Sequence, residues 1–400
     1  MKEGFNRRYL RLVTGVVSLL FAGIIYAWSI LKVPLASEFG WNASQLALNF
    51  TLTMCFFAIG GMVSGVIVKR TGPKAVIIAG GILSAAGFFI SSRNTGSISM
   101  LYLSYGVMSG LGIGFAYNAI VSSTNSWFPD KRGLSSGILM IGFGMSSLVI
   151  GNLSNTLINS PGTGWRKTYV ILAVCLGAVL TGEGFFAAFP KYTEQGSNDK
   201  AQVSQSDDTD TRTMLRESTF WKFYLYLVTL TAVGNVVISA ARDMAISTGA
   251  SAALATSLVG VLAVCNGLGR LLSGSIYDKF GRRTAMTAGC IVSVLAPAFI
   301  LAGIMTKSVI SGVTGICLSG LSYGFSPTVS AAVTGEFYGQ KYFPLNFAIA
   351  STILIPTSFV ATLVGSVVTS TGSYVIPCII LIILAAISMV LSVIIKRPAK

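Results

Sequence analysis

Hydrophobic residues in this chain are grouped into long blocks, and short segments between the blocks hold most of the polar and charged residues. Blocks of about 20 residues match the hydrocarbon thickness of a bilayer, at about 1.5 Å of rise per helical residue. Strand-like alternation is absent, and backbone groups in lipid must be paired internally, so the blocks are predicted to be helices. We expect twelve spans, at 10–31, 45–68, 75–92, 98–121, 133–153, 168–189, 219–241, 252–275, 284–305, 309–333, 344–368 and 374–395.

One segment between the sixth and seventh blocks has a different composition. Residues 191–217 are rich in Ser, Asp, Thr and Gln. A segment this polar cannot bury a core, so it is predicted to be a flexible cytoplasmic linker. The linker divides the chain into residues 1–190 and 218–400. The expected fold is therefore an all-α membrane protein with twelve transmembrane helices in two pseudo-symmetric six-helix bundles.

A short motif occurs once in each half, directly after the second span of that half. Both copies follow G-x-x-x-[D/K]-[R/K]-x-G-x-[R/K], at 65–74 and 274–283. A duplicated six-helix unit is typical of secondary transporters, in which the substrate binds between the halves near the bilayer midplane. The motif positions that we expect to govern conformational change are Gly65, Arg70, Gly72, Gly274, Asp278, Gly281 and Arg282.

Composition and charge support a membrane protein. Of the 400 residues, 53% are hydrophobic and 10% are charged, whereas soluble domains contain about 25% charged residues. The net charge of +15 does not indicate nucleic-acid binding, because the basic residues lie in loops. With both termini on the cytoplasmic side, 21 Lys and Arg face the cytoplasm and six face outward, as the positive-inside rule requires. The six are Lys32, Arg93, Arg166, Lys167, Arg242 and Lys307.

The chain lacks the residues of a metal or cofactor site. It contains no histidine, and its six cysteines lie singly within apolar blocks. No paired carboxylates or nucleophile arrangement indicates a membrane enzyme, so we expect neither a cofactor nor catalysis. The first apolar block is as long as a full span, and we interpret it as a transmembrane helix rather than a cleaved signal peptide.

Arg270 is the most informative single residue, since it lies inside the eighth span. An arginine at mid-membrane costs about 2.5–3.5 kcal/mol on insertion scales, so it indicates function. Its planar guanidinium is suited to a carboxylate, to which it donates two parallel hydrogen bonds. Asn266 lies four residues earlier on the same helix face. The alternatives are a structural ion pair for Arg270, with Glu183 as the available acid, and an interhelical hydrogen bond for Asn266.

The loop motifs resemble the signature of the major facilitator superfamily. The second copy matches that signature, and the first departs from it at Lys69, where the family has an aspartate. Further stretches resemble the oxalate–formate antiporter family, which belongs with the monocarboxylate transporters. They are Tyr26-Ala-Trp28-Ser-Ile-Leu-Lys-Val-Pro34, Phe39-Gly40-Trp41, Trp127-Phe-Pro-Asp-Lys-Arg-Gly133 and Asn266-Gly-Leu-Gly-Arg270.

This resemblance implies further substrate contacts. Tyr117 and Tyr323 match positions at which the family supplies aromatic hydroxyls, and Asn118 lies beside the first. Tyr26 and Trp28 are expected to line the pocket. For each of these residues, core packing is the alternative. The glycines around Tyr117, at 106, 110, 112 and 114, are expected to let helices approach closely instead. Asn235 and Pro356 are weaker candidates, for binding and for helix flexing.

The eleventh span lacks the lysine that the oxalate-exchanging member of the family has there. One cation suits a monoanion, because a second unpaired carboxylate in a low-dielectric site is expensive. We therefore expect a transporter of a monocarboxylate such as lactate, pyruvate, formate or acetate, working by alternating access as a proton symporter or an anion exchanger. The resemblance implies that it is a monomer. The alternatives are a dicarboxylate antiporter of the oxalate–formate type and a non-transporting sensor on the same fold. The expected partners are the small organic anion, protons in the case of symport, and the lipid bilayer.

Overall fold

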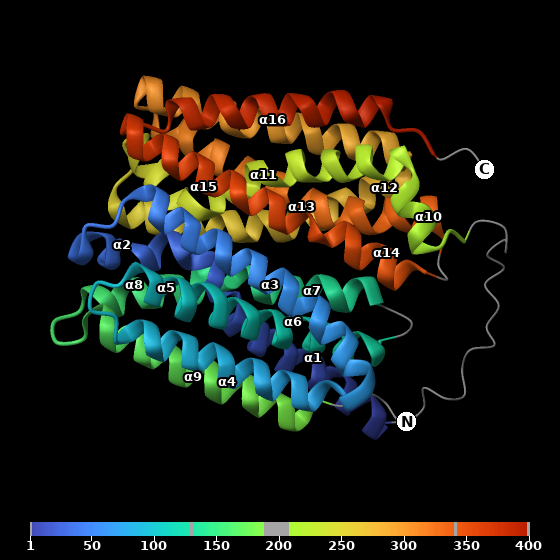
Figure 1. Cartoon of the computed structure of the whole chain (residues 1–400), viewed down its shortest axis with the longest axis horizontal. Helices are drawn as coiled ribbons and strands as arrows, with labels where there is room; N and C mark the ends of the chain where they lie inside the picture. Colours follow the sequence, from blue (N-terminus) through green and yellow to red (C-terminus); the bar gives the residue numbers. More distant parts are fainter. Residues whose placement is uncertain (1, 129–131, 188–207, 340–341, 398–400) are drawn as a thin grey trace. The chain divides into compact units, whose positions relative to one another are not determined.

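The computed structural model describes residues 2–128, 132–187, 208–339 and 342–397, and within them it contains helices and no strands (Figure 1). The predicted all-α fold is confirmed. In chain order the elements are α1 (Lys2–Ala22), η1 (Gly23–Ala27), α2 (Trp28–Phe39), α3 (Ala43–Thr71), α4 (Pro73–Ser92), α5 (Ile98–Leu101), η2 (Tyr102–Ser109), α6 (Gly110–Ser126), α7 (Arg132–Ser146), η3 (Ser147–Gly151), α8 (Asn152–Asn159), α9 (Gly164–Phe186), α10 (Thr211–Arg216), α11 (Ser218–Ser247), α12 (Ala252–Thr306), α13 (Val309–Tyr338), α14 (Phe343–Ala350), η4 (Ser351–Ile353), α15 (Leu354–Thr371) and α16 (Val375–Ile394).

The described part of the chain contains eleven helical stretches that are long and apolar enough to cross a membrane. The longest of them, α12, has 55 residues and contains a break at Gly281, where φ is 79° and ψ is 175°. These angles lie outside the helical region and at positive φ, which glycine adopts without strain. The break divides α12 into 252–280 and 282–306, so the described residues form the twelve predicted spans.

The two copies of the loop motif have the same backbone turn. Gly72 follows α3 with φ 76° and ψ 170°, close to the values at Gly281. Each glycine lies at the corresponding position of its motif. The internal repeat found in the sequence is therefore also a repeat of local structure.

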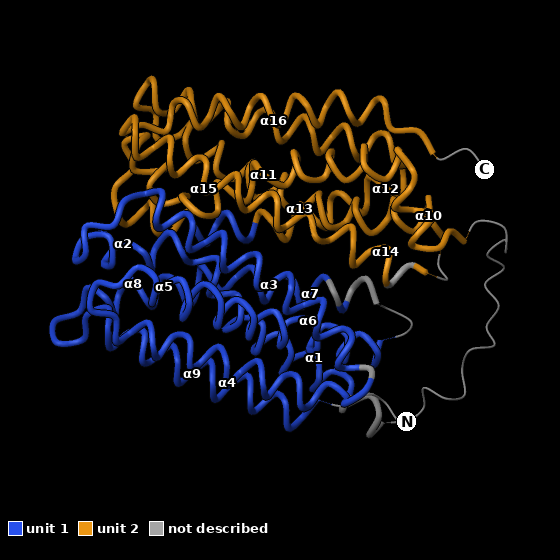
Figure 2. The backbone as a smooth tube through the Cα atoms, viewed as in Figure 1, with its two compact units in different colours: residues 1–193, 259–264 blue, residues 194–258, 265–400 orange. Residues whose placement is uncertain are grey.

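The chain forms two compact units, coloured separately in Figure 2. Unit 1 comprises Met1–Thr193 and Val259–Val264, and unit 2 comprises Glu194–Leu258 and Cys265–Lys400. Within unit 1, α4 packs along α9 and α3 packs along α6. Within unit 2, α11 packs against α13, α15 and α16.

Small residues let the helices of unit 1 lie close together, as the glycines in 106–114 predict. A Cβ atom on Gly114 of α6 would lie 2.3 Å from the carbonyl oxygen of Phe57 on α3. One on Gly112 would lie 2.6 Å from the carbonyl oxygen of Gly80 on α4. Only glycine allows backbones to approach this closely, and such contacts stabilise helix pairs in lipid, where burial of apolar surface gives little driving force.

The segment that leads into unit 2 differs from the expected flexible linker. Residues 191–207 lie outside the described residues, but α10 follows at Thr211–Arg216. Met214 is fully buried in the apolar core of unit 2, and the Thr211 hydroxyl contacts Oδ1 of buried Asn346 at 2.6 Å. The packing of Met214 and the hydrogen bond of Thr211 hold the end of the segment on unit 2, and it is helical there.

Several helices continue past the span ends that hydrophobicity predicts, and the first and seventh spans are two of them. The first span runs to Phe39 rather than residue 31, and the seventh runs to Ser247 rather than residue 241. Lys32 and Arg242, which we expected in outer loops, therefore lie inside helices. The hydrophobic pattern ends at these two basic residues, although the helices that contain them continue.

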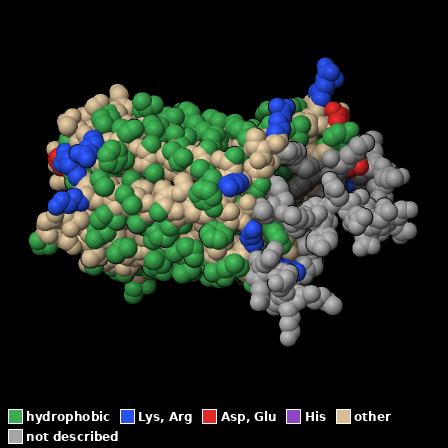
Figure 3. Space-filling model, turned by 90° about the horizontal axis from the view of Figure 1, so that it is seen from below, with side chains coloured by type: hydrophobic (Ala, Val, Ile, Leu, Met, Phe, Trp, Pro, Cys, Tyr) green, Lys and Arg blue, Asp and Glu red, His purple; other side chains and the backbone are tan. Residues whose placement is uncertain are grey.

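Figure 3 shows one face of the molecule, on which hydrophobic side chains cover a broad middle region while Lys and Arg lie toward its ends. Many large apolar residues are exposed, among them Ile82, Phe89 and Val174. In water an apolar surface of this extent is unfavourable. It is the surface expected of a protein that is solvated by lipid.

Candidate functional site

The first half of α12 contacts α13 through two glycines beside the predicted substrate residues. A Cβ atom on Gly324 would lie 2.2 Å from the carbonyl oxygen of Asn266, and one on Gly269 would lie 2.2 Å from that of Leu321. The two backbones are therefore in direct contact at this level. The contact fixes the position of Asn266 and Arg270 relative to α13.

Arg270 has a half-buried side chain and lies about 16 Å along the helix from the turn at Gly281. Its backbone carbonyl accepts a hydrogen bond from the Ser273 hydroxyl at 3.0 Å. Within the part of the chain that the structure describes, its guanidinium has no ion pair and no hydrogen bond. The structural ion pair considered as the alternative is thus absent among these residues.

Asn266 is 4% exposed, and its Oδ1 atom has no hydrogen-bond partner among the described residues. A buried amide oxygen without a partner costs about 1–3 kcal/mol. The residue lies one helical turn from Arg270, on the same face. Together the two side chains offer a guanidinium donor and an amide to a small polar ligand.

Tyr323 and Asn235 lie on neighbouring helices of unit 2. The Tyr323 side chain packs against Gly234 of α11, next to Asn235. The Asn235 amide donates to the Ser358 hydroxyl of α15 at 3.1 Å, and its Oδ1 atom has no partner among the described residues. Asn235 is fully buried, so unit 2 holds a second buried amide with an unused acceptor.

The candidates in unit 1 are held by contacts within that unit. The Tyr117 hydroxyl lies 2.8 Å from the Met140 sulfur, and the Asn118 amide donates to the Gly61 carbonyl at 2.8 Å. The Tyr26 ring packs edge-on against another aromatic ring in unit 1, with ring centroids 5.2 Å apart. Trp28 is fully buried, and its indole N–H donates to a backbone carbonyl of α3 at 3.0 Å. The substrate roles of these four residues stay predictions.

Lys32 is a residue that sequence reasoning placed wrongly. It lies inside the first span on α2, and only 8% of its surface is exposed. A cation inside a membrane span marks a functional position as strongly as Arg270 does. The extension of the span to Phe39 was not visible in the hydrophobicity pattern, so the burial of Lys32 could not be foreseen.

Glu183 is buried in α9 and is not isolated. The Thr14 hydroxyl and the Arg11 guanidinium of α1 interact electrostatically with its carboxyl group. These contacts join α1 to α9 within unit 1. They favour a packing role for Glu183 over a role as a proton carrier.

In the second motif copy, Arg282 has partners that the motif alone does not reveal. Its Nε lies 3.5 Å from Oε1 of Glu336 at the end of α13, and its guanidinium lies 4.6 Å from the Phe337 ring centroid. The Tyr277 hydroxyl also donates to Glu336. Asp278 of the motif is exposed instead. The position of Glu336 at the end of a span was the available sequence clue.

The first motif copy lacks this cluster. Pro73 occupies the position of Arg282, and the first copy has Val68 where the second has Tyr277. Arg70 is exposed. The loop motif at 127–133 lies partly outside the described residues. The two units therefore share the backbone turn at Gly72 and Gly281, but among the described residues the ionic contacts of Arg282 have no counterpart at the first turn.

The comparisons with known proteins agree with this architecture. The family model described as Major Facilitator Superfamily matches residues 13–241 and 223–400. The fold resembles the solved structure of the nucleoside transporter NupG, with a TM-score of 0.73 and 12% identity over 97% of this chain and 98% of that one. It also resembles a bacterial homologue of the human lysosomal transporter Spinster, with a TM-score of 0.67 and 14% identity over 97% of this chain and 95% of that one.

Two curated relatives match most of the chain, and a third matches just under half of it. The uncharacterized MFS-type transporter YhjX of Escherichia coli is 29% identical over 86% of this chain and 83% of its own length. The oxalate:formate antiporter of Oxalobacter formigenes is 24% identical over 88% of this chain and 83% of its own length. Human monocarboxylate transporter 2 is 28% identical over 46% of this chain and 38% of its own length. These matches confirm the predicted resemblance and place the chain among transporters rather than enzymes. The chain belongs to the major facilitator superfamily.

Proposed function

We propose that this protein is a secondary active transporter of a small monocarboxylate, such as lactate, pyruvate, formate or acetate. The observation that carries the proposal is the Arg270 guanidinium, which has no partner among the described residues although it lies in a membrane span. An unpaired cation at this depth costs about 2.5–3.5 kcal/mol on insertion scales. A bound carboxylate offsets that cost and accepts two hydrogen bonds from the guanidinium.

The relatives support the same class of substrate. An oxalate:formate antiporter and monocarboxylate transporters are among them, and all of these names describe carboxylate transport. The geometry of Asn266 adds to this, because its unused amide oxygen suits a substrate hydroxyl. Tyr323, Tyr117, Tyr26, Asn118 and Trp28 are proposed to contribute further contacts.

The proposed mechanism is alternating access. The empty carrier holds the positive charge of Arg270, which disfavours its passage through an occluded state. The carboxylate neutralises that charge and permits the passage, which couples transport either to exchange of a second anion or to symport of a proton. We further propose that both termini lie in the cytoplasm, on the basis of the 21 to six distribution of Lys and Arg. By analogy with the fold, we propose a monomer in the plasma or inner membrane.

Uptake by proteoliposomes tests the substrate class. We expect labelled lactate and formate to enter, and excess unlabelled monocarboxylates to compete better than oxalate. A single cation at the site stabilises a monoanion and leaves the second charge of oxalate unpaired. Preference for oxalate over lactate would overturn the monocarboxylate assignment, and absence of transport for every carboxylate would overturn the proposal itself.

One observation favours a second candidate, exchange of a dicarboxylate such as oxalate. Lys32 is a buried cation within the first span, so the chain holds a basic residue in a span of each unit. Two cations suit a dianion better than one does. Under this candidate the same assay gives oxalate uptake that depends on oxalate or formate inside the vesicles, and Lys32→Gln changes the preference from oxalate to lactate.

Replacing Asn266 by aspartate tests whether residue 266 acts through Arg270. The new carboxylate lies one turn from Arg270 and pairs with it, so uptake at neutral pH is expected to fall about tenfold. The guanidinium lowers the pKa of the aspartate below its ordinary value of about 3.9, so the pair persists and uptake is expected to stay low down to about pH 5. The measurement is the pH profile of lactate uptake from about pH 5 to about pH 8.

Asn266→Ala is the control for that profile. It removes the amide without adding an acid, and it should leave the shape of the profile as in the wild type. Equal profiles for Asn266→Asp and Asn266→Ala would show that residue 266 does not communicate with Arg270.

A further inference from the structure

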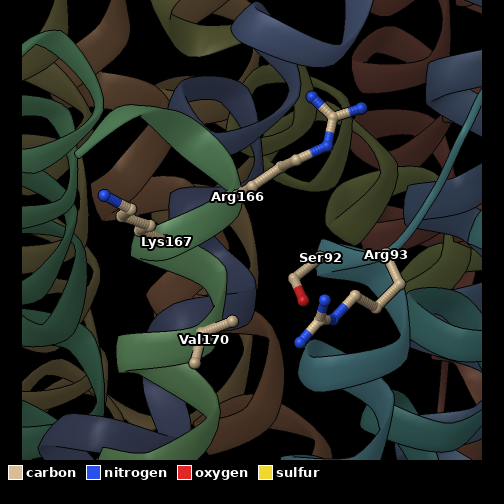
Figure 4. Close-up of a pocket in the computed structure, with 5 residues that line it drawn as sticks. All are labelled: Ser92, Arg93, Arg166, Lys167 and Val170. Atoms are coloured by element: carbon tan, nitrogen blue, oxygen red, sulfur yellow. The ribbon is translucent and has the colours of Figure 1, made fainter. Parts of the chain in front are cut away.

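Unit 1 has a basic pocket at the end of the membrane spans that lies opposite the termini in the predicted topology. Of the six Lys and Arg expected at that end, Lys32 and Arg242 lie inside helices. Three of the other four, Arg93, Arg166 and Lys167, line one cavity of about 290 Å³ (Figure 4). Basic residues are depleted at this end of the protein, so three of them around one cavity indicate a site for an anion.

The pocket lies between the end of α4 and the first turns of α9, and Ser92 and Val170 complete its lining. Figure 4 shows the Arg93 guanidinium extending from α4 toward Val170 of α9, while Arg166 and Lys167 leave α9 in different directions. The two helices pack along their length, so both sides of the pocket belong to one rigid pair.

The carboxylate of Glu38 lies near the pocket, and it already pairs with one of the three basic residues. Glu38 pairs with Arg166 at 2.7 Å and accepts a hydrogen bond from the Trp165 indole at 2.6 Å. Lys167 donates to the Gly162 carbonyl, and among the described residues neither Arg93 nor Lys167 has an ion pair. The Arg93 guanidinium lies 5.2 Å from the Phe89 ring centroid. The pocket therefore keeps two positive charges that no carboxylate of the described residues neutralises.

The surface next to the pocket is apolar along both helices. On α4, exposed Ile82 and Phe89 lie on the face that ends in Arg93, at spacings of seven and four residues. The α9 face is similar: exposed Ile171 and Val174 follow Lys167 at helical spacing. Each lipid-facing stripe thus ends in a cation. A soluble anion would make no contact with these apolar stripes, whereas a lipid can place its acyl chains along them.

We propose that this pocket binds the headgroup of an anionic phospholipid, with the phosphate between Arg93 and Lys167 and the acyl chains along α4 and α9. Each basic residue near a membrane surface strengthens the binding of anionic lipid, and the two contributions add. The site is separate from Arg270, so it is independent of the transported substrate.

Native mass spectrometry of the purified, delipidated protein tests the proposal. We expect phosphatidylglycerol to be retained about tenfold more strongly than phosphatidylcholine, and the Arg93→Gln/Lys167→Gln double variant to lose this preference. The charge-retaining double variant Arg93→Lys/Lys167→Arg should keep it. Lys307→Gln is the matched control, since Lys307 is an exposed cation in another loop at the same end of the spans.

Three results would overturn the proposal. They are equal retention of the two lipids by the wild type, an unchanged preference in the glutamine double variant, and displacement of phosphatidylglycerol by an equal concentration of glycerol 3-phosphate. The third result would show that the pocket binds a phosphate group without regard to acyl chains. Elution of each variant as a single species in size-exclusion chromatography establishes that a loss of lipid is not a loss of fold.

Discussion

Replacing Arg270 by glutamine is expected to lower carboxylate uptake at least about 100-fold in proteoliposomes. The variant loses the charge and both parallel hydrogen bonds, and each charge-assisted bond contributes about 1.5–3 kcal/mol. Since 1.4 kcal/mol corresponds to a factor of ten, loss of two such bonds removes a hundredfold or more in affinity. The measurement is the initial rate of labelled lactate uptake over a range of lactate concentrations.

A second variant at residue 270 separates the contribution of the positive charge from that of the planar guanidinium geometry. Arg270→Lys keeps the positive charge but loses the planar fork, so it is expected to retain partial uptake with affinity lowered about tenfold. Arg212→Gln is the matched control, because Arg212 is an exposed arginine of α10 and its side chain should have no part in binding. Uptake by Arg270→Gln at the wild-type rate would show that the guanidinium does not bind the substrate.

Much of this architecture follows from the sequence, because bilayer thickness constrains it directly. Runs of about 20 apolar residues predict the twelve spans, and the repeated glycine of the loop motif lies at the shared turn, at Gly72 and Gly281. Arg270 was identified by the same logic, since a charge in a span is costly enough to indicate function. These features depend on local residue types, which can be read directly from the sequence.

The features that the sequence did not reveal depend on contacts between distant residues. The partner of Arg282 is Glu336 on another helix, 54 positions further along the chain, and the motif that contains Arg282 suggests Asp278 instead. Lys32 was assigned to a loop because hydrophobicity falls before the helix ends. The docking of Met214 depends on apolar residues of unit 2 that lie far from it in the sequence, which no local pattern encodes.

The contact between α12 and α13 is another such feature, and it leads to a prediction about Gly324. An alanine there would place its Cβ 2.2 Å from the Asn266 carbonyl oxygen and 2.8 Å from the Arg270 backbone nitrogen. Both are backbone atoms, so no side chain can rotate away and the helices must separate. Overpacking of this kind costs about 1–3 kcal/mol. Gly324→Ala is expected to lower the apparent Tm in detergent by about 3–10 °C.

The same variant should also impair transport, since separation of α12 from α13 displaces Asn266 and Arg270 from the substrate. Loss of about 1.4 kcal/mol of binding lowers affinity tenfold, so the KM for lactate should rise by at least that factor. Gly182→Ala in α9 is the matched control, because a Cβ there meets no atom within 4 Å and alanine favours the helix. Gly182→Ala should keep the Tm and the KM of the wild type. If Gly324→Ala also kept both, the close approach of α12 and α13 would have no part in positioning Arg270. If Tm fell while KM stayed constant, the contact would support the fold alone, and the substrate would bind elsewhere than beside Asn266.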